Sequence, residues 1–99
     1  MKLINVTNSH SRLVREQLEH TDAELVKIYT AGDITVIYTM APTHLEIVLK
    51  NNKRAIKANE INEIKHHFLQ KIPATTYQDT DISINDTPNL VEISIPISM

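Results

Sequence analysis

Two neighbouring histidines are the residues whose chemistry stands out first. His66 and His67 lie in a stretch with helical spacing, and Glu63 precedes His67 by one turn. A metal site here would use Glu63 and His67 together with ligands from elsewhere in the chain. Zinc-binding histidines on one helix face are typically four residues apart, and no such pair occurs in this sequence. We therefore interpret Glu63 and His67 as an exposed helix-face contact and predict no metal and no other cofactor.

An acidic segment, Asp79 to Asp86, has oxygen-bearing side chains at alternate positions, like the start of a calcium-binding loop. Such a loop needs glycine at its sixth position and a bidentate glutamate at its twelfth. Ile84 and Leu90 occupy those two positions. The pattern therefore predicts a solvated loop that leads into a strand.

A polar stretch between the first predicted strand and the first predicted helix is a candidate anion site. Free backbone N–H groups and the helix dipole favour anions at a helix start. The side chains that would contribute are Asn8, Ser9, Ser11 and Arg12. One hypothesis is a regulator that binds a phosphate-bearing metabolite here, and the alternative is an ordinary capped helix.

Four of the ten basic residues fall in one predicted hairpin: Lys50, Lys53, Arg54 and Lys57. Such a cluster can contact a phosphate backbone. No aromatic residue is interleaved for base stacking, and the net charge of the chain is −2. We interpret the cluster as a solvated basic turn and keep nucleic-acid contact as a weaker hypothesis.

The composition disfavours several classes of enzyme. The sequence has no cysteine and one glycine, so thiol chemistry and glycine-rich phosphate loops are excluded. No pair of carboxylates stands in a clearly apolar setting, and no nucleophile elbow is present. No secretory signal or run of about 18 apolar residues occurs. We expect a single cytosolic domain spanning residues 1–99, and we lean towards a protein that is not an enzyme.

Alternating and helical periodicities predict the elements that position these residues. The predicted order is strand, helix, three or four strands, helix and strand. The first helix is capped within 8–11 and runs to about residue 20, and the other ranges are 2–7, 24–30, 34–40, 44–50, 59–72 and 91–97. Lys53 to Ala58 is either a further strand, which we favour, or the start of the second helix. We predict an α+β two-layer sandwich with a mostly antiparallel sheet and both helices on one face. The order β-α-β-β-β-(β)-α-β is a ferredoxin-like variant. If its first two strands are neighbours or near-neighbours in one sheet, they should be parallel.

The turn between the ranges 24–30 and 34–40 sets the register of the sheet. We predict a three-residue loop that places Ile28 opposite Val36, because a one-residue shift would bring a lysine onto the apolar face. Leu25, Tyr29 and Ile37 then form a second, half-apolar face. Contiguous exposed apolar surface tends to mark an interface. The leading hypothesis is therefore a non-enzymatic protein-interaction module that forms a homodimer, which Ile37→Asp should break without unfolding the protein.

The opening Met1–Ser9 and the segment Val36–Thr39 give the chain its one family resemblance. With these segments it resembles a family of uncharacterised proteins of similar length from streptococci, enterococci and their relatives. The resemblance implies a cytosolic bacterial protein. It implies no activity and no functional residue.

Overall fold

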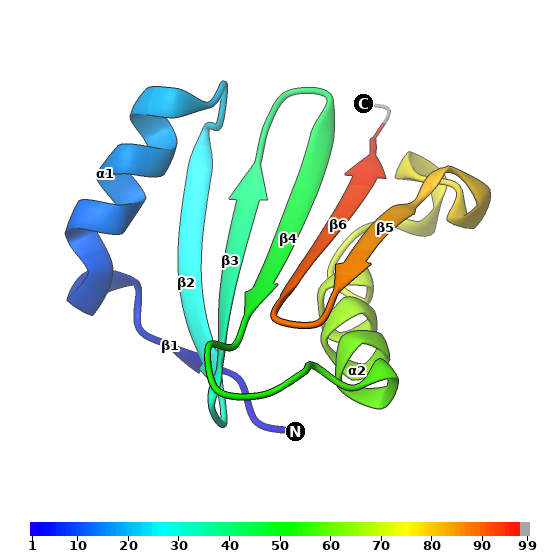
Figure 1. Ribbon diagram of the computed structural model, residues 1–99. Coiled ribbons are helices and arrows are strands. Elements are labelled where there is room, and N and C mark those ends of the chain that lie inside the picture. The colour runs from blue at the N-terminus through cyan, green and yellow to red at the C-terminus, as the bar shows by residue number, and fades with distance from the viewer. Residues whose placement is uncertain (98–99) are drawn as a thin grey trace.

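The computed structural model describes residues 1–97, which form a six-stranded antiparallel sheet and two α-helices (Figure 1). The strands are β1 (Ile4–Asn5), β2 (Leu25–Ala31), β3 (Ile34–Met40), β4 (His44–Lys50), β5 (Ser83–Thr87) and β6 (Leu90–Pro96). The helices are α1 (Ser11–His20) and α2 (Ala58–Leu69). The strand order is β1-β2-β3-β4-β6-β5, so the last strand lies inside the sheet. Within the described residues, neither helix is long and apolar enough to cross a membrane.

The predicted α+β class and the antiparallel sheet are confirmed, but the prediction that both helices cover one face is wrong. The β2–β3 hairpin carries apolar side chains on both of its faces. Leu13 and Val14 of α1 pack on one face, and α2 packs on the other. Each apolar face therefore has its own helix, since neither could be left wholly in water.

The two faces bury unequal cores. Between the sheet and α2 lies the main core, whose buried members are Ala31, Ile34, Val36, Leu45, Ile47, Leu49, Ile56, Ile61, Ile64, Phe68, Val91, Ile93 and Ile95. The second core, beneath α1, has three buried members: Val26, Ile28 and Ile37. No residue of α1 itself is buried. The sheet and α2 therefore form the body of the fold, and α1 is attached to one side of it.

The predicted three-residue loop between β2 and β3 is wrong. Ala31 pairs with Ile34, so the turn is the two-residue Gly32-Asp33, and Tyr29 lies opposite Val36. Gly32 has φ +62°, a left-handed conformation that suits glycine in a tight hairpin turn. This register does bring Lys27 opposite Tyr38. The sheet tolerates the lysine because its long side chain can cover apolar surface while its ammonium group stays in water.

The first strand also differs from the prediction. β1 pairs antiparallel with the end of β2, not parallel to it. The chain continues from β1 through a 3-10 turn (Thr7–His10) into α1 without reversing, and β2 then returns (Figure 1). The Thr7 hydroxyl accepts a hydrogen bond from the Ile28 backbone N–H at 3.1 Å. The side chain of Thr7 thus satisfies a β2 backbone group that a neighbouring strand would otherwise have paired.

Residues 53–57 form a loop and Ala58 begins α2, so the favoured fourth strand is wrong. The Asn51 carboxamide oxygen accepts hydrogen bonds from the backbone N–H groups of Lys53 (2.9 Å) and Arg54 (3.3 Å). The Asn89 amide donates to the carbonyls of Asn51 (2.8 Å) and Arg54 (3.0 Å). Side chains thus satisfy backbone groups that a strand would have paired, and β6 fills the position beside β4. Ile56 still points inward and is buried in the main core.

Candidate functional site

The α2-side face of the β2–β3 hairpin carries a group of incompletely buried apolar residues. The two-residue turn places Leu25 opposite Met40, on the same face as Tyr29 and Tyr38. Leu25 is 38% exposed, and the other three are partly buried against the main core. We call these four residues the aromatic surface. It exists because α2 and the sheet bury the rest of this face but leave this part of it open to solvent.

Phe68 of α2 supports the two tyrosines from below. The ring of Tyr38 stacks on Phe68 with centroids 4.9 Å apart and an interplanar angle of 13°. The ring of Tyr29 meets Phe68 edge to face at 5.4 Å. Both geometries are favourable for aromatic pairs. Burial raises the pKa of both Tyr29 and Tyr38, so the phenols are neutral at physiological pH. The two tyrosine rings are therefore held in place by Phe68 and carry no charge.

An apolar pocket of about 170 Å³ adjoins this surface where α2 ends. It is lined by Tyr38, Met40, Leu45, Lys71, Ile72, Pro73, Thr76 and Ile97. Tyr38 and Met40 belong to both features, so the pocket and the aromatic surface are continuous. An apolar side chain of another molecule can be buried here without displacing any strand.

Two of the three residues predicted as an interface lie on this surface, and one does not. Leu25 and Tyr29 share the α2 side, but Ile37 lies on the opposite face, beneath α1, and is 2% exposed. Ile37 was predicted to lie on an exposed face, and that premise of the Ile37→Asp experiment is wrong. Sequence reasoning missed Tyr38 and Met40, because the predicted register assigned them to the core. The tight-turn preference of Gly32-Asp33 was the signal that could have found them.

The four residues of the predicted anion site do not line one pocket. Asn8 and Ser9 line a pocket beside the outer edge of β2, whereas Ser11 and Arg12 are exposed at the start of α1. Arg12 pairs with Glu16 at 3.2 Å, and its side chain is 91% exposed. No side-chain cap forms at the start of α1. Anion binding at this place stays a prediction.

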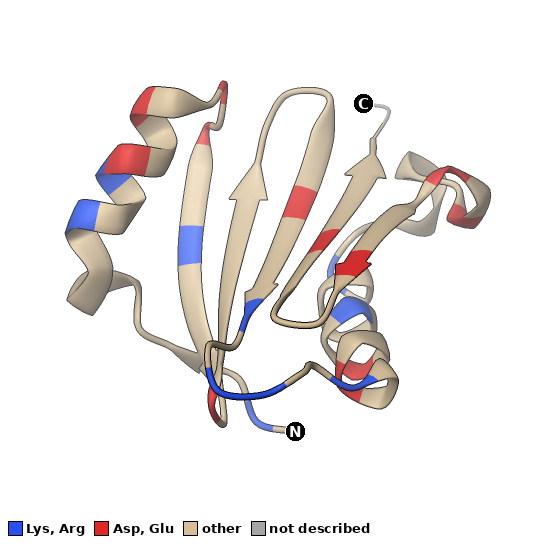
Figure 2. Cartoon of the chain, viewed as in Figure 1, with Lys and Arg blue, Asp and Glu red and all other residues tan. Residues whose placement is uncertain are grey.

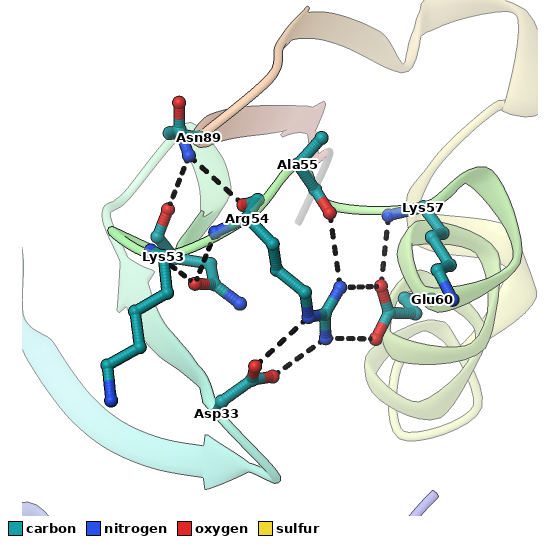
Figure 3. A network of polar contacts seen from close by, with 8 residues as sticks. Asp33, Lys53, Arg54, Ala55, Lys57, Glu60 and Asn89 are labelled. Carbon is teal, nitrogen blue, oxygen red and sulfur yellow. Dashed lines mark hydrogen bonds and ion pairs between the residues drawn. The ribbon is translucent and has the colours of Figure 1, made fainter.

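Arg54 has a structural role in the basic cluster, which follows the loop between β4 and α2 (Figure 2). Its guanidinium donates two hydrogen bonds to Asp33 (2.7 and 3.0 Å) and two to Glu60 (both 2.8 Å). A fifth hydrogen bond goes to the carbonyl of Ala55 at 3.1 Å (Figure 3). All five N–H donors of the guanidinium are therefore used. Arg54 ties the β2–β3 turn to the start of α2 and has no donor left for a phosphate.

This network shifts the acidity of its members. The hydrogen bonds from Arg54 hold the pKa of Asp33 and that of Glu60 at about 2, and they raise the pKa of Arg54. Glu60 also accepts a hydrogen bond from the Lys57 backbone N–H at 2.9 Å, which caps α2. The side chains of Lys50, Lys53 and Lys57 are exposed. Contact of these three lysines with nucleic acid stays a prediction.

The histidines of α2 lie near each other but do not form a metal-binding group. His66 hydrogen bonds to Gln70 at 2.9 Å, and the ring of His67 packs edge-on against Phe68 at 5.2 Å. Within residues 1–97, no group of three or more metal-ligating side chains comes together. Of the acidic segment, Asp79–Asp81 forms a 3-10 turn, and the chain then enters β5.

Comparison with known proteins places the chain in a family. A crystal structure described as "a conserved protein of unknown function from Streptococcus thermophilus LMG 18311" matches it with a TM-score of 0.94 and 42% sequence identity. The match covers 100% of this chain and 99% of that one. No curated protein matches the chain. A family model described as "Domain of unknown function (DUF1827)" matches residues 1–96. These matches agree with the streptococcal resemblance seen in the sequence, and the chain belongs to the DUF1827 family.

Proposed function

We propose that the protein is a non-enzymatic, cytosolic interaction module that binds another protein through the aromatic surface. The observation that carries this proposal is the position of Leu25, Tyr29, Tyr38 and Met40. They lie side by side on one rigid sheet, partly exposed and continuous with an apolar pocket. Tyrosine is enriched at protein interfaces because it buries a large apolar area and keeps a polar tip in water.

Charge favours a different protein over a second copy of the chain. Lys27 lies within the aromatic surface, directly opposite Tyr38. In a symmetric dimer built on this small patch, the same residues meet around the two-fold axis, so the two Lys27 ammonium groups would face each other. Like charges brought together at an interface disfavour that pairing. The homodimer expected from the sequence is therefore the alternative that the experiment must test.

Leu25→Asp is the variant that tests the proposal, and Ile84→Asp is its matched control. Leu25 is 38% exposed and Ile84 is 43% exposed, so a charge at either position should leave the fold intact. Ile84 lies opposite Ile93, on the same side of the sheet but in the far edge strand β5. The parent and both variants are immobilised and exposed to extract of the cells that make the protein. Retained proteins are quantified by mass spectrometry, and each candidate is purified and its affinity measured.

We expect a protein that binds the parent and Ile84→Asp equally and binds Leu25→Asp at least about 30-fold more weakly, as for a central interface residue. The proposal fails if no purified protein shows this dependence on Leu25. Sedimentation of the three proteins tests the alternative. A parent dimer that Leu25→Asp alone converts to a monomer would mean that the partner is a second copy.

A further inference from the structure

The pocket beside the aromatic surface has a size that suits one side chain. Its volume is about 170 Å³, and its walls are mainly aliphatic: Met40, Leu45, Ile72, Pro73 and Ile97, with the ring of Tyr38. Apolar cavities of about 150 Å³ accept a molecule the size of benzene. The ring of a phenylalanine or a branched aliphatic group therefore matches this volume.

One lysine lines the pocket, and a second lies beside one of its lining residues. Lys71 belongs to its lining, at the end next to α2. Lys27 projects from β2 directly opposite Tyr38, on the same face of the sheet. No carboxylate lines the pocket, and among residues 1–97 neither lysine forms an ion pair. A cation in the wall of an apolar pocket, with a second cation further along the same face of the sheet, is complementary to an apolar group with negative charges next to it.

We infer that the pocket takes one aromatic or branched aliphatic side chain from a partner segment that carries carboxylates beside that side chain. The apolar group fills the space between Tyr38, Leu45 and Ile72, and the flanking carboxylates meet Lys71 and Lys27. This inference rests on the proposed function, because it names the kind of segment that the interaction module recognises. The contribution of the lysines is electrostatic and exposed, so it selects among apolar segments and adds modestly to affinity.

Three pentapeptides with blocked ends test this inference. Each has a central phenylalanine, flanked on both sides by aspartates, by serines or by lysines. Each is titrated into the isotope-labelled protein, and the backbone amide signals of Tyr38, Met40 and Ile72 are followed by NMR. The variant Lys71→Met removes one rim charge. Lys53→Met is the matched control, since Lys53 is an exposed lysine that lines a different pocket. The small acid 4-phenylbutyrate tests whether a free carboxylate metabolite is the true source of the ligand.

We expect the aspartate peptide to shift these three amides and to bind about three- to tenfold more tightly than the serine peptide, as for an exposed charge pair. The lysine peptide should bind most weakly. Lys71→Met should reduce the preference for aspartate and leave binding of the serine peptide unchanged, whereas Lys53→Met should behave as the parent. Salt at 1 M should also reduce the preference, because it screens exposed charges.

The possible failures are distinguishable. Equal binding of all three peptides at the pocket overturns the acidic partner and leaves the interaction module standing. No shift of the pocket amides with any peptide overturns the pocket as the anchor site, while Leu25-dependent binding of a protein still tests the module. Binding of 4-phenylbutyrate as tightly as the aspartate peptide, without any Leu25-dependent protein partner, overturns both and indicates a metabolite site.

Discussion

The two cores on opposite faces of the sheet should respond differently to the same deletion. Ile37→Ala and Ile47→Ala each remove the same three carbon atoms from a residue that is at most 2% exposed. Ile47 lies between neighbouring strands and under α2 in the main core, whereas Ile37 lies beneath α1. The comparison therefore holds the chemistry constant and changes only the surroundings.

The size of the difference follows from how well each site can close over the missing atoms. Replacing a buried isoleucine by alanine lowers the free energy of unfolding by about 2–5 kcal/mol, and the cost rises with the cavity that remains. Ile47 pairs with the fully buried Ile93 on one side and on the other with Tyr38, whose ring is held by Phe68, so we expect about 4 kcal/mol, near the top of that range. Above Ile37, Leu13 and Val14 are only partly buried on a helix without buried residues. That helix can move inward, so we expect about 2–2.5 kcal/mol.

Equilibrium unfolding in urea, followed by circular dichroism, measures both variants against the parent. A gap of about 1.5–2 kcal/mol between them should appear as a clear difference in midpoint at an unchanged slope. Hydrogen exchange gives a second readout: Ile37→Ala should speed exchange of the α1 amides more than that of the β4 amides. A cost for Ile37→Ala equal to or above that for Ile47→Ala would refute the view that α1 is a loosely attached element.

Three further predictions concern the turn, the polar network and one histidine. Gly32→Ala should lower the free energy of unfolding by about 1–2 kcal/mol, because a Cβ there meets open space but the backbone stays left-handed at φ +62°. Thermal unfolding measures this, and an unchanged melting temperature would contradict it. Asp33 and Glu60 have a pKa of about 2 in the folded state, below their ordinary values of 3.8 and 4.5. Their contribution to stability should be present above about pH 4.5 and fall as the pH drops towards 2, and Arg54→Met should lose most of that pH dependence in urea titrations. Burial, followed by the charge of a nearby lysine, lowers the pKa of His67, so an NMR midpoint at or above 6.5 would be inconsistent with its packing on α2.

Local patterns identified most elements of the fold. The structure has β3 and β4 at the predicted bounds, and α1 ends at His20 as predicted, because alternation and helical spacing follow from which side chains face the core. Ile56 is buried in the main core, although its segment is not the strand that we favoured. A buried residue needs an apolar neighbourhood but not a particular secondary structure, so periodicity alone could not separate these cases.

The features that could not be predicted from the sequence depend on contacts between residues far apart in the chain. We predicted a three-residue loop between β2 and β3 in order to keep Lys27 off the apolar face. That reasoning failed because the sequence does not show that α2 leaves this part of the face open to solvent. The network of Arg54 joins Asp33, Arg54 and Glu60 from three separate segments. No pattern within any one of these segments predicts which other segment it contacts. The aromatic surface depends on the same register, so Tyr38 and Met40 could be recognised as surface residues only once the turn was known.

The position of β6 inside the sheet determines the order in which the chain can assemble. β2, β3 and β4 are joined by short turns, so they can pair early as a local meander. β6 pairs with β4 only after α2 and its long connection have closed a large loop. Until then the edge of β4 is unpaired, with Leu45, Ile47 and Leu49 uncovered beside it, and such an edge can pair with another chain. During synthesis β6 emerges after every other described strand. The nascent protein therefore passes through a stage with an open central edge, and that stage is when it is most exposed to aggregation.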